Sequence, residues 1–184
     1  IAAIDFTTVE VWTKSGLVTF YLLVAMELKT RRVHFVGCTT SPHEQWMQQA
    51  ARELTNFEDG FLNDKRALIM DRDTKYSEEF RDFLDREDVK PVRCPVRAPN
   101  CNAFAERFVR SIKDECLDRL ILFGEASLRR ALREYGAHYH SERNHQGVGS
   151  RLLEPPGKVA SINDRIHCRE RLGGMLNFYY REAA

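Results

Sequence analysis

The first forty residues contain three strand-like segments in succession, separated only by short polar connections. Residues 1–12, 17–28 and 33–39 are rich in β-branched, aromatic and other apolar side chains and lack a helical repeat. The connections at 13–16 and 29–32 are too short to hold a crossover helix, so neighbouring strands are expected to pair antiparallel. The chain therefore begins with an antiparallel meander.

Helical and strand patterns alternate after this meander. Ser41, Pro42 and Glu44 are typical of a helix start, and the helix is predicted to run to about Phe57. The following patterns predict a strand at 67–70, a helix at 76–86, a strand at 89–94 and helices at 103–122 and 127–139. Two strands joined through a helix favour parallel pairing. We expect an α/β fold whose mixed five-stranded sheet has three antiparallel and then two parallel strands, flanked by helices.

The 184 residues have the length of one domain with a short appendage. We place the domain at residues 1–153 and a basic C-terminal extension at 154–184, where Pro155, Pro156 and Gly157 interrupt any helix. The extension carries Arg165, Arg169 and Arg171 and is predicted to be helical in part. Because the sequence opens within a strand and without Met, we expect it to be a piece of a longer protein.

Several function classes are disfavoured by composition. Five cysteines, an odd number without a C-x-x-C pair, favour a reduced cytoplasmic compartment. The longest apolar run, residues 17–26, is too short to span a bilayer, so no membrane partner is expected. The sequence has no Walker loop and no G-x-G-x-x-G motif, and no organic cofactor is expected.

Charge is balanced over the whole chain but not along it. Lys and Arg number 28 against 27 Asp and Glu, which gives a net charge of +1 and argues against strong general affinity for nucleic acid. Between Lys90 and Lys113, however, six basic residues surround a single acid, Glu106. The sequence is therefore neutral overall and locally basic around one carboxylate.

Three carboxylates are candidates for chemistry. Asp5 interrupts an apolar strand, where a charge is costly unless it is paired or binds a metal. Asp71 follows the strand at 67–70, at the sheet edge where α/β proteins usually bind ligands, and it is favoured over Asp73, which lies farther into the loop. Glu106 stands in the first turn of a predicted helix and shares one face with Arg110.

Each carboxylate also has an ordinary structural explanation. Asp5 would be unremarkable on a solvent-facing edge strand or beside an arginine, and Asp71 would be unremarkable in a turn. Glu106 and Arg110 have the spacing of a surface ion pair, which contributes only a few tenths of a kcal/mol. Such a pair leaves the surrounding excess of positive charge unexplained. Taken together, three carboxylates suit Mg²⁺ or Mn²⁺, which prefer oxygen ligands, and basic neighbours suit a phosphodiester backbone.

Longer motifs resemble the integrase catalytic core, and in particular the bacterial insertion-sequence transposases that share it. The resemblance is carried by residues 69–76 (IMDRDTKY), 97–113 (RAPNCNAFAERFVRSIK) and 139–147 (YHSERNHQG). It covers about residues 1–156, with the motifs in the order of the family. Phe108 stands where Trp is frequent and Asn144 where Pro is common, and neither belongs to the expected catalytic residues.

The resemblance implies a ribonuclease H-like fold and a D-D-E triad of Asp5, Asp71 and Glu106, with 65 and 34 intervening residues. These three residues would be both the catalytic residues and the ligands of two Mg²⁺ or Mn²⁺ ions. The resemblance also implies a set of residues that contact DNA: Arg97, Asn102, Arg110 and Lys113.

The activity implied is that of a transposase or integrase, a polynucleotidyl transferase and endonuclease. It would cleave DNA strands and transfer them in transposition or DNA integration, by direct phosphoryl transfer without a covalent protein intermediate. The partners would be mobile-element ends and target DNA, bound by a homo-oligomer in the bacterial cytoplasm, associated with the nucleoid during the reaction. Two alternatives remain: a ribonuclease H-type nuclease without strand joining, and a non-catalytic remnant that binds DNA and oligomerises. A zinc site at His138, His140 and His145 is disfavoured against ordinary histidines at a helix end.

Overall fold

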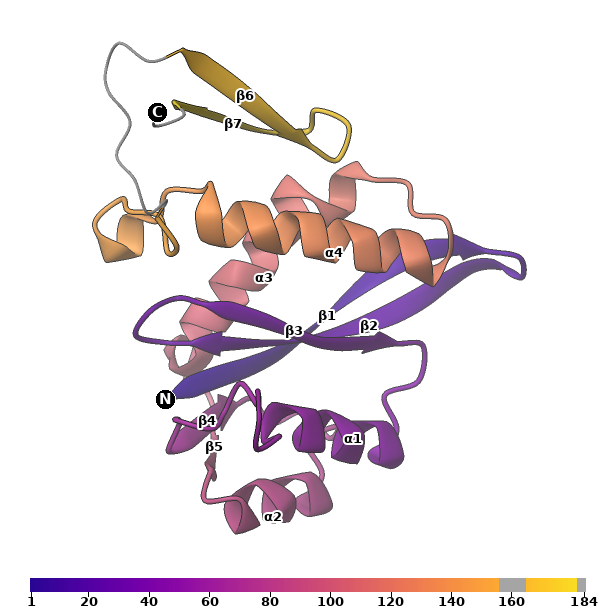
Figure 1. Ribbon diagram of the computed structural model, residues 1–184. Helices are drawn as coiled ribbons and strands as arrows, with labels where there is room; N and C mark the ends of the chain where they lie inside the picture. Colours follow the sequence, from indigo (N-terminus) through magenta and orange to yellow (C-terminus); the bar gives the residue numbers. More distant parts are fainter. Residues whose placement is uncertain (156–164, 182–184) are drawn as a thin grey trace. The chain divides into compact units, whose positions relative to one another are not determined.

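The computed structural model describes residues 1–155 and 165–181 and groups the chain into two compact units, 1–125 and 126–184. Unit 1 is built on a five-stranded sheet of order β3-β2-β1-β4-β5 (Figure 1). Its strands are β1 (Ala2–Thr13), β2 (Gly16–Glu27), β3 (Val33–Thr39), β4 (Ala67–Met70) and β5 (Lys90–Arg93). The units divide at 125/126, whereas the sequence suggested a boundary near 153.

The predicted strand arrangement is confirmed. β1 and β2 pair antiparallel along their full length, from Ala2 opposite Glu27 to Thr13 opposite Gly16, and β2 pairs antiparallel with β3. Gly16 closes the first hairpin at a φ of +102°, a conformation that glycine adopts without strain. β4 pairs parallel with β1, and β5 pairs parallel with β4. The sheet thus contains three antiparallel strands followed by two parallel strands.

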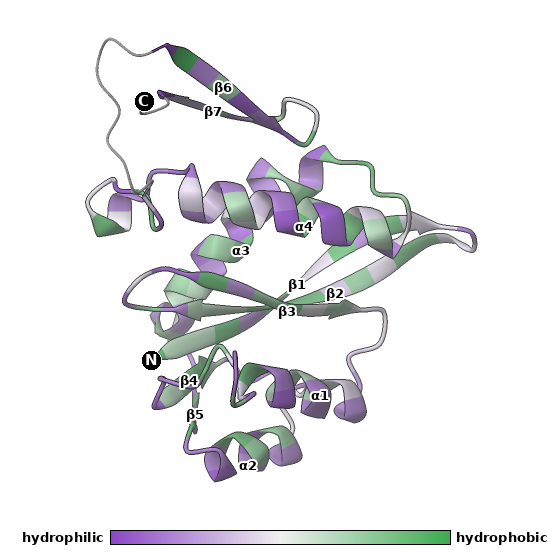
Figure 2. Cartoon of the chain, viewed as in Figure 1, coloured by the Kyte–Doolittle hydropathy of each residue, from purple (hydrophilic) through white to green (hydrophobic). Residues whose placement is uncertain are grey.

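Two helices cover one face of the sheet, α1 (Glu44–Leu54) and α2 (Glu78–Arg86) (Figure 1). The strands are mostly apolar, whereas these helices mix apolar and polar residues, as expected for helices with one buried side (Figure 2). The buried residues between sheet and helices form the main core, which includes Ile4, Leu23, Leu68, Met47, Leu54, Phe80 and Leu84.

The first helix is shorter than predicted at both ends. Its N-cap is His43, whose Nδ1 accepts a hydrogen bond from the Trp46 N–H at 3.2 Å, so Ser41 and Pro42 lie before the helix. It ends at Leu54, the last of its buried residues, and Phe57 is 95% exposed. The apolar character of Phe57 extended the predicted helix beyond the segment that the core stabilises.

The opposite face of the sheet carries α3 (Ala103–Glu115), which follows a short 3₁₀ turn, η1 (Pro99–Asn102). Ala105, Phe108 and Ile112 are its buried residues, and the Phe108 ring lies 6.0 Å from that of Phe35 on β3. This packing fixes α3 against the antiparallel half of the sheet.

The helix predicted to reach residue 122 ends instead at Glu115. A 3₁₀ turn, η2 (Leu117–Arg119), follows, and it lets both Leu117 and Leu122 become buried. The Leu122 carbonyl then accepts a hydrogen bond from the Trp12 N–H at 2.8 Å. Burial of two leucines and this backbone contact with β1 favour the turn over further helix.

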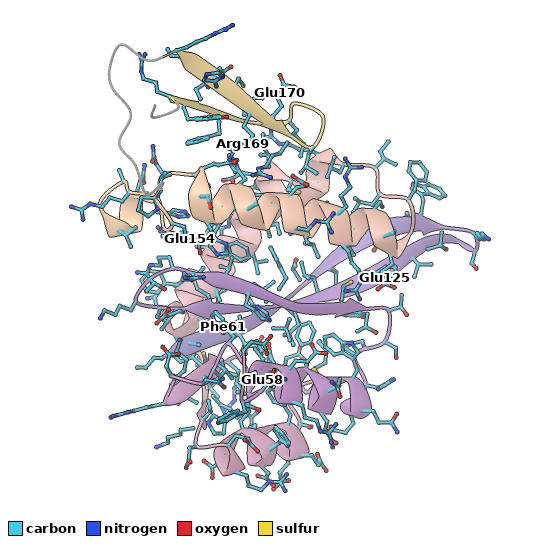
Figure 3. The ribbon with its side chains drawn as sticks, viewed as in Figure 1. Glu58, Phe61, Glu125, Glu154, Arg169 and Glu170 are labelled. Atoms are coloured by element: carbon cyan, nitrogen blue, oxygen red, sulfur yellow. The ribbon has the colours of Figure 1, made fainter. Side chains whose placement is uncertain are left out.

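Unit 2 contains most of α4 (Gly124–Ser141), the 3₁₀ turn η3 (Gln146–Val148) and a hairpin of β6 (Ile166–Arg171) and β7 (Leu176–Arg181). Residues 166–181 of the extension thus form a hairpin, whereas residues 156–164 and 182–184, with Pro156 and Gly157, lie outside the described residues. On β6, Arg169 points to the side of α4 and Glu170 to the other side (Figure 3). None of the helices described here is both long enough and apolar enough to cross a membrane.

Candidate active site

Asp5 lies on the face of the sheet that α3 covers. Its neighbours Ile4 and Phe6 face the core under α1 and α2, and successive side chains of a strand point to opposite faces. Ala3 is paired with Ile69 on β4, and continuing this parallel register by two residues brings Asp5 level with Asp71. Two aspartates distant in sequence therefore meet at the same level of neighbouring strands.

Asp71 directly follows β4 and shapes the turn behind it. Its Oδ1 accepts a hydrogen bond from the Asp73 N–H at 2.9 Å. Asp73 is engaged differently, because its carboxylate accepts hydrogen bonds from both the backbone N–H and the ammonium group of Lys75. The structure thus distinguishes the two acids: a lysine neutralises Asp73 and leaves the carboxylate of Asp71 without that partner.

Glu106 occupies the first turn of α3 and is exposed. Carboxylates are stabilised at this end of a helix by the unsatisfied backbone N–H groups. Neither Glu106 nor Arg110 has an ion-pair partner within 4.0 Å among the described residues, so the surface pair suggested by their spacing is absent there. The flexible Glu106 side chain can therefore turn without breaking an ion pair.

The three carboxylates share an electrostatic environment. Burial raises the pKa of Asp5 from 3.8 to about 7, and the like charges of Asp71, Glu106 and Asp73 contribute to this rise, against the Phe6 N–H that stabilises the ionised form. Burial also raises the pKa of Tyr76, with contributions from Asp5 and Asp71. The repulsion among these carboxylates shows that negative charge is concentrated here, and a bound cation would reduce that repulsion.

Cys94, just after β5, is influenced by two of the same carboxylates. Burial raises the pKa of its thiol to about 12, with further contributions from Cys101, Asp71 and Glu106. A thiol held in this protonated state is a poor nucleophile. Cys94 is therefore not expected to act as a nucleophile in this region.

No metal-binding group is preassembled in the parts of the chain that the structure describes: nowhere do three His, Cys, Asp or Glu side chains come together closely enough to hold an ion. The donor set itself suits Mg²⁺ or Mn²⁺, because Asp5, Asp71 and Glu106 offer only carboxylate oxygens. The Tyr76 hydroxyl, whose pKa the charges of Asp5 and Asp71 help to raise, is buried and has no hydrogen-bond partner among the described residues. An unsatisfied polar atom of this kind is consistent with a site that is completed by a ligand.

The residues expected to contact DNA fall into two groups. Arg97 and Arg110 are exposed and Lys113 is half-buried, so all three are accessible to a phosphate backbone. Asn102 is only 4% exposed, and its side-chain amide donates a hydrogen bond to the Ile4 carbonyl at 3.1 Å. This geometry gives Asn102 an internal contact, and the DNA contact that the resemblance implied stays a prediction.

Sequence reasoning missed the internal roles of Tyr76 and Asn102. Tyr76 belongs to the motif that follows Asp71, but nothing local shows that its ring contacts Phe6, with centroids 5.7 Å apart. The contact of Asn102 with Ile4 spans 98 residues of sequence. Both roles depend on tertiary packing, and only the position of these residues inside the quoted motifs pointed to them.

Comparison with known proteins identifies the fold. Residues 87–152 match the family of integrase core domains. The HTLV-2 integrase catalytic core domain in complex with magnesium has a TM-score of 0.57 at 14% identity, over 83% of this chain and 91% of that one. The catalytic core domain of BIV integrase has a TM-score of 0.54 at 15% identity, over 83% and 89%.

A longer match extends over both units. A chain of the simian T-cell lymphotropic virus intasome, solved in complex with PP2A regulatory subunit B56 gamma, has a TM-score of 0.54 at 14% identity. It covers 98% of this chain and 66% of that chain. No curated protein sequence matches this one.

Proposed function

We propose that this chain, an integrase-type catalytic core by its ribonuclease H-like fold and by the family match of residues 87–152, cleaves DNA strands and joins them to new sites. The reaction class is polynucleotidyl transfer in DNA integration. We assign it to an element of the bacterial insertion-sequence kind, acting on nucleoid DNA in the cytoplasm. The observation that carries the proposal is the parallel register of β1 and β4, which continues to Asp5 and Asp71 at one level of neighbouring strands. The raised pKa of Asp5, caused by burial and by the charges of Asp71 and Glu106, supports it.

The proposed catalytic residues are Asp5, Asp71 and Glu106. Held by these carboxylates, two Mg²⁺ or Mn²⁺ ions would supply Lewis acidity for the attacking oxygen and charge compensation at the leaving oxygen. Asp5 and Asp71 come from neighbouring strands in a fixed register, whereas Glu106 projects from a helix and can turn toward them. The HTLV-2 core that shares this fold was solved with magnesium, which supports the choice of ion.

Basic side chains around the carboxylates would hold the DNA. Arg110 lies one turn beyond Glu106 on α3, Lys113 lies about two turns beyond it, and Arg97 lies in the exposed loop before η1. Their charges would position phosphates without reading sequence. The simian virus chain of similar fold belongs to an intasome, and the HTLV-2 core was solved in a trimeric form; both support the proposal that this chain works as a homo-oligomer on DNA.

Plasmid nicking in Mn²⁺ tests this function with a matched pair of variants. Asp71→Asn is expected to abolish metal-dependent nicking and strand joining, while Asp73→Asn keeps most of the activity because Lys75 already neutralises Asp73. Full activity of Asp71→Asn, or equal loss in both variants, would contradict the assignment.

Two further measurements separate the alternatives. Cleavage of an RNA–DNA hybrid without any joining of DNA would favour a ribonuclease H-type nuclease. Absence of Mn²⁺ binding by titration calorimetry, with DNA present, would favour a non-catalytic remnant. Binding of Mn²⁺ by the wild type and its loss in Asp71→Asn would support the transferase.

A further inference from the structure

We propose that Asn102 is a positioning residue that fixes the catalytic end of α3 against β1. This inference rests on the proposed function, because it concerns the relative placement of Asp5 and Glu106. The contact that carries it is the hydrogen bond from Asn102 Nδ2 to the Ile4 carbonyl, 3.1 Å long and buried.

This hydrogen bond links two segments that lie next to proposed catalytic residues. Ile4 immediately precedes Asp5, and Asn102 lies four residues before Glu106, directly ahead of α3. One side-chain contact thus joins the backbone beside the first carboxylate to the start of the helix that carries the third. A displacement of about 1 Å between reacting groups can cost about a hundredfold in rate, so such a contact matters for catalysis.

Asn102 gives up its usual role to make this contact. It is the N-cap residue of α3, and an asparagine in that position normally accepts a hydrogen bond from a backbone N–H of the first turn. Here the side chain makes no capping hydrogen bond. It donates its hydrogen bond instead to the Ile4 carbonyl on β1 of the sheet.

The orientation of the amide is fixed by chemistry. Its partner is a carbonyl oxygen, which only accepts hydrogen bonds, so the NH₂ group must face Ile4 and the amide oxygen must point away. That oxygen, Oδ1, is buried and has no partner among the described residues. A buried acceptor without a donor is costly, and its retention is explained if the amide serves the site rather than stability alone.

Another contact near the start of α3 is made by Phe104: the Arg31 guanidinium, between β2 and β3, lies 3.5 Å from the centroid of its ring. Residues 95–97 in the preceding loop are exposed, and Phe104 is 45% exposed. Ala105 supplies the first buried side chain of the helix, and the larger contacts of Phe108 and Ile112 lie farther along. Without the Asn102 contact, the first turn with Glu106 would keep the Arg31–Phe104 contact and buried Ala105 but lose its hydrogen bond to β1.

The test compares Asn102→Leu, which keeps the volume but removes the donor, with Leu84→Ala, which removes a fully buried side chain of α2 on the other face. In the metal-free protein, Asn102→Leu is expected to speed hydrogen exchange at residues 101–106 by about tenfold, because local opening becomes easier. Leu84→Ala is expected to lower global stability without this local change. Unchanged exchange at 101–106 in Asn102→Leu would overturn the proposal.

Catalysis and metal binding provide the second readout. Asn102→Leu is expected to lower kcat for plasmid nicking by about tenfold or more, with KM for DNA changed less than about twofold, because substrate binding is retained and alignment is lost. The Kd for Mn²⁺ should rise several-fold, whereas Leu84→Ala keeps both values below its melting temperature. Equal kcat losses in the two variants would show a merely structural role.

The two proposals fail separately. If the wild type neither nicks DNA nor binds Mn²⁺, the proposed function is wrong, and hydrogen exchange still decides whether Asn102 ties α3 to β1. If the wild type is active and Asn102→Leu matches it in kcat and in Mn²⁺ affinity, the positioning role is wrong and the function stands.

Discussion

The carboxylate of Glu142 accepts hydrogen bonds from the Arg171 guanidinium, through Nε at 2.9 Å and Nη2 at 2.7 Å, although the Glu142 side chain is only 1% exposed. Arg169 and His138 add hydrogen bonds at 3.2 and 3.1 Å. Glu142 follows α4 directly and both arginines lie on β6, so this one carboxylate attaches the hairpin to the helix within unit 2.

Replacement of Glu142 by Gln should detach the hairpin. Because the change leaves Arg171 without its buried partner, we expect the free energy of unfolding to fall by about 2–3 kcal/mol, measured by urea denaturation. Glu134→Gln is the matched control, because Glu134 makes a single contact with Arg171, at 2.8 Å, and is 28% exposed. A loss as large for Glu134→Gln would contradict the special role of Glu142.

Glu142 also predicts how stability depends on pH in the acid range. Burial acts to raise the pKa of Glu142, but hydrogen bonds from Arg171, His138 and Arg169 outweigh it, and the net pKa is lowered from 4.5. A lowered folded-state pKa gives stability that is present above the unfolded value and lost as pH falls through the folded one. Below pH 4.5 the wild type should lose stability more steeply than Glu142→Gln. Parallel acid melting curves would contradict this.

Asp5 predicts the opposite dependence in metal-free protein. Because its folded-state pKa is raised to about 7, the folded state binds the proton more tightly, and stability falls as pH rises from 3.8 through about 7. Asp5→Asn should therefore raise the melting temperature in EDTA, and the gain should be larger at about pH 8 than at about pH 5. Glu10→Gln, on the same strand but exposed, should show no such gain.

Gly60, between α1 and β4, has no room for a side chain. A Cβ at this position would lie 2.5 Å from both the backbone N and O of Asn56. We expect Gly60→Ala to destabilise the fold by about 1–3 kcal/mol in thermal unfolding, since backbone atoms cannot yield as side chains do. Gly37→Ala should cost less, because its close contact, at 3.1 Å, is with the movable ring of Trp46.

DNA binding should depend on α3 through charge. Arg110→Ala and Lys113→Ala are each expected to weaken binding uniformly across sequences and to lower the slope of log K against log salt by about 1. Arg86→Ala, on α2 at the opposite face of the sheet, should leave that slope unchanged. Fluorescence anisotropy at several salt concentrations measures these effects. Equal slopes for the α3 variants and the wild type would remove these two residues from the interface.

Much of the sheet could be predicted, because a strand is recognisable from the apolar and β-branched residues within its own segment. The strands at 33–39 and 67–70 were predicted to the residue, and the short connections dictated which neighbours run antiparallel. The hairpin at 166–181 was missed because β6 carries two arginines on the side that faces α4. Their partner, Glu142, is 27 to 29 residues away and lies on no local pattern.

The candidate site shows the same division. Asp5, Asp71 and Glu106 were chosen from residue type, from their positions in a strand, at a strand end and in a first helical turn, and from motif resemblance. Their catalytic role remains a prediction. The contact of Asn102 with DNA was inferred from its motif and stays a prediction, whereas its buried hydrogen bond to Ile4 was not foreseen. Burial and a partner 98 residues away are properties of the folded chain, which no spacing within a motif contains.

The pairing of β1 with β4 involves only two residues of β1, Ala2 and Ala3, although β1 is twelve residues long. This short parallel pairing, a seam of two residue pairs, joins the strand that bears Asp5 to the strand that leads to Asp71. Warming should open such a seam before the long antiparallel meander melts. Heating would then abolish activity while most of the secondary structure persists. The temperature at which activity is lost should therefore lie below the temperature at which the circular dichroism signal is lost.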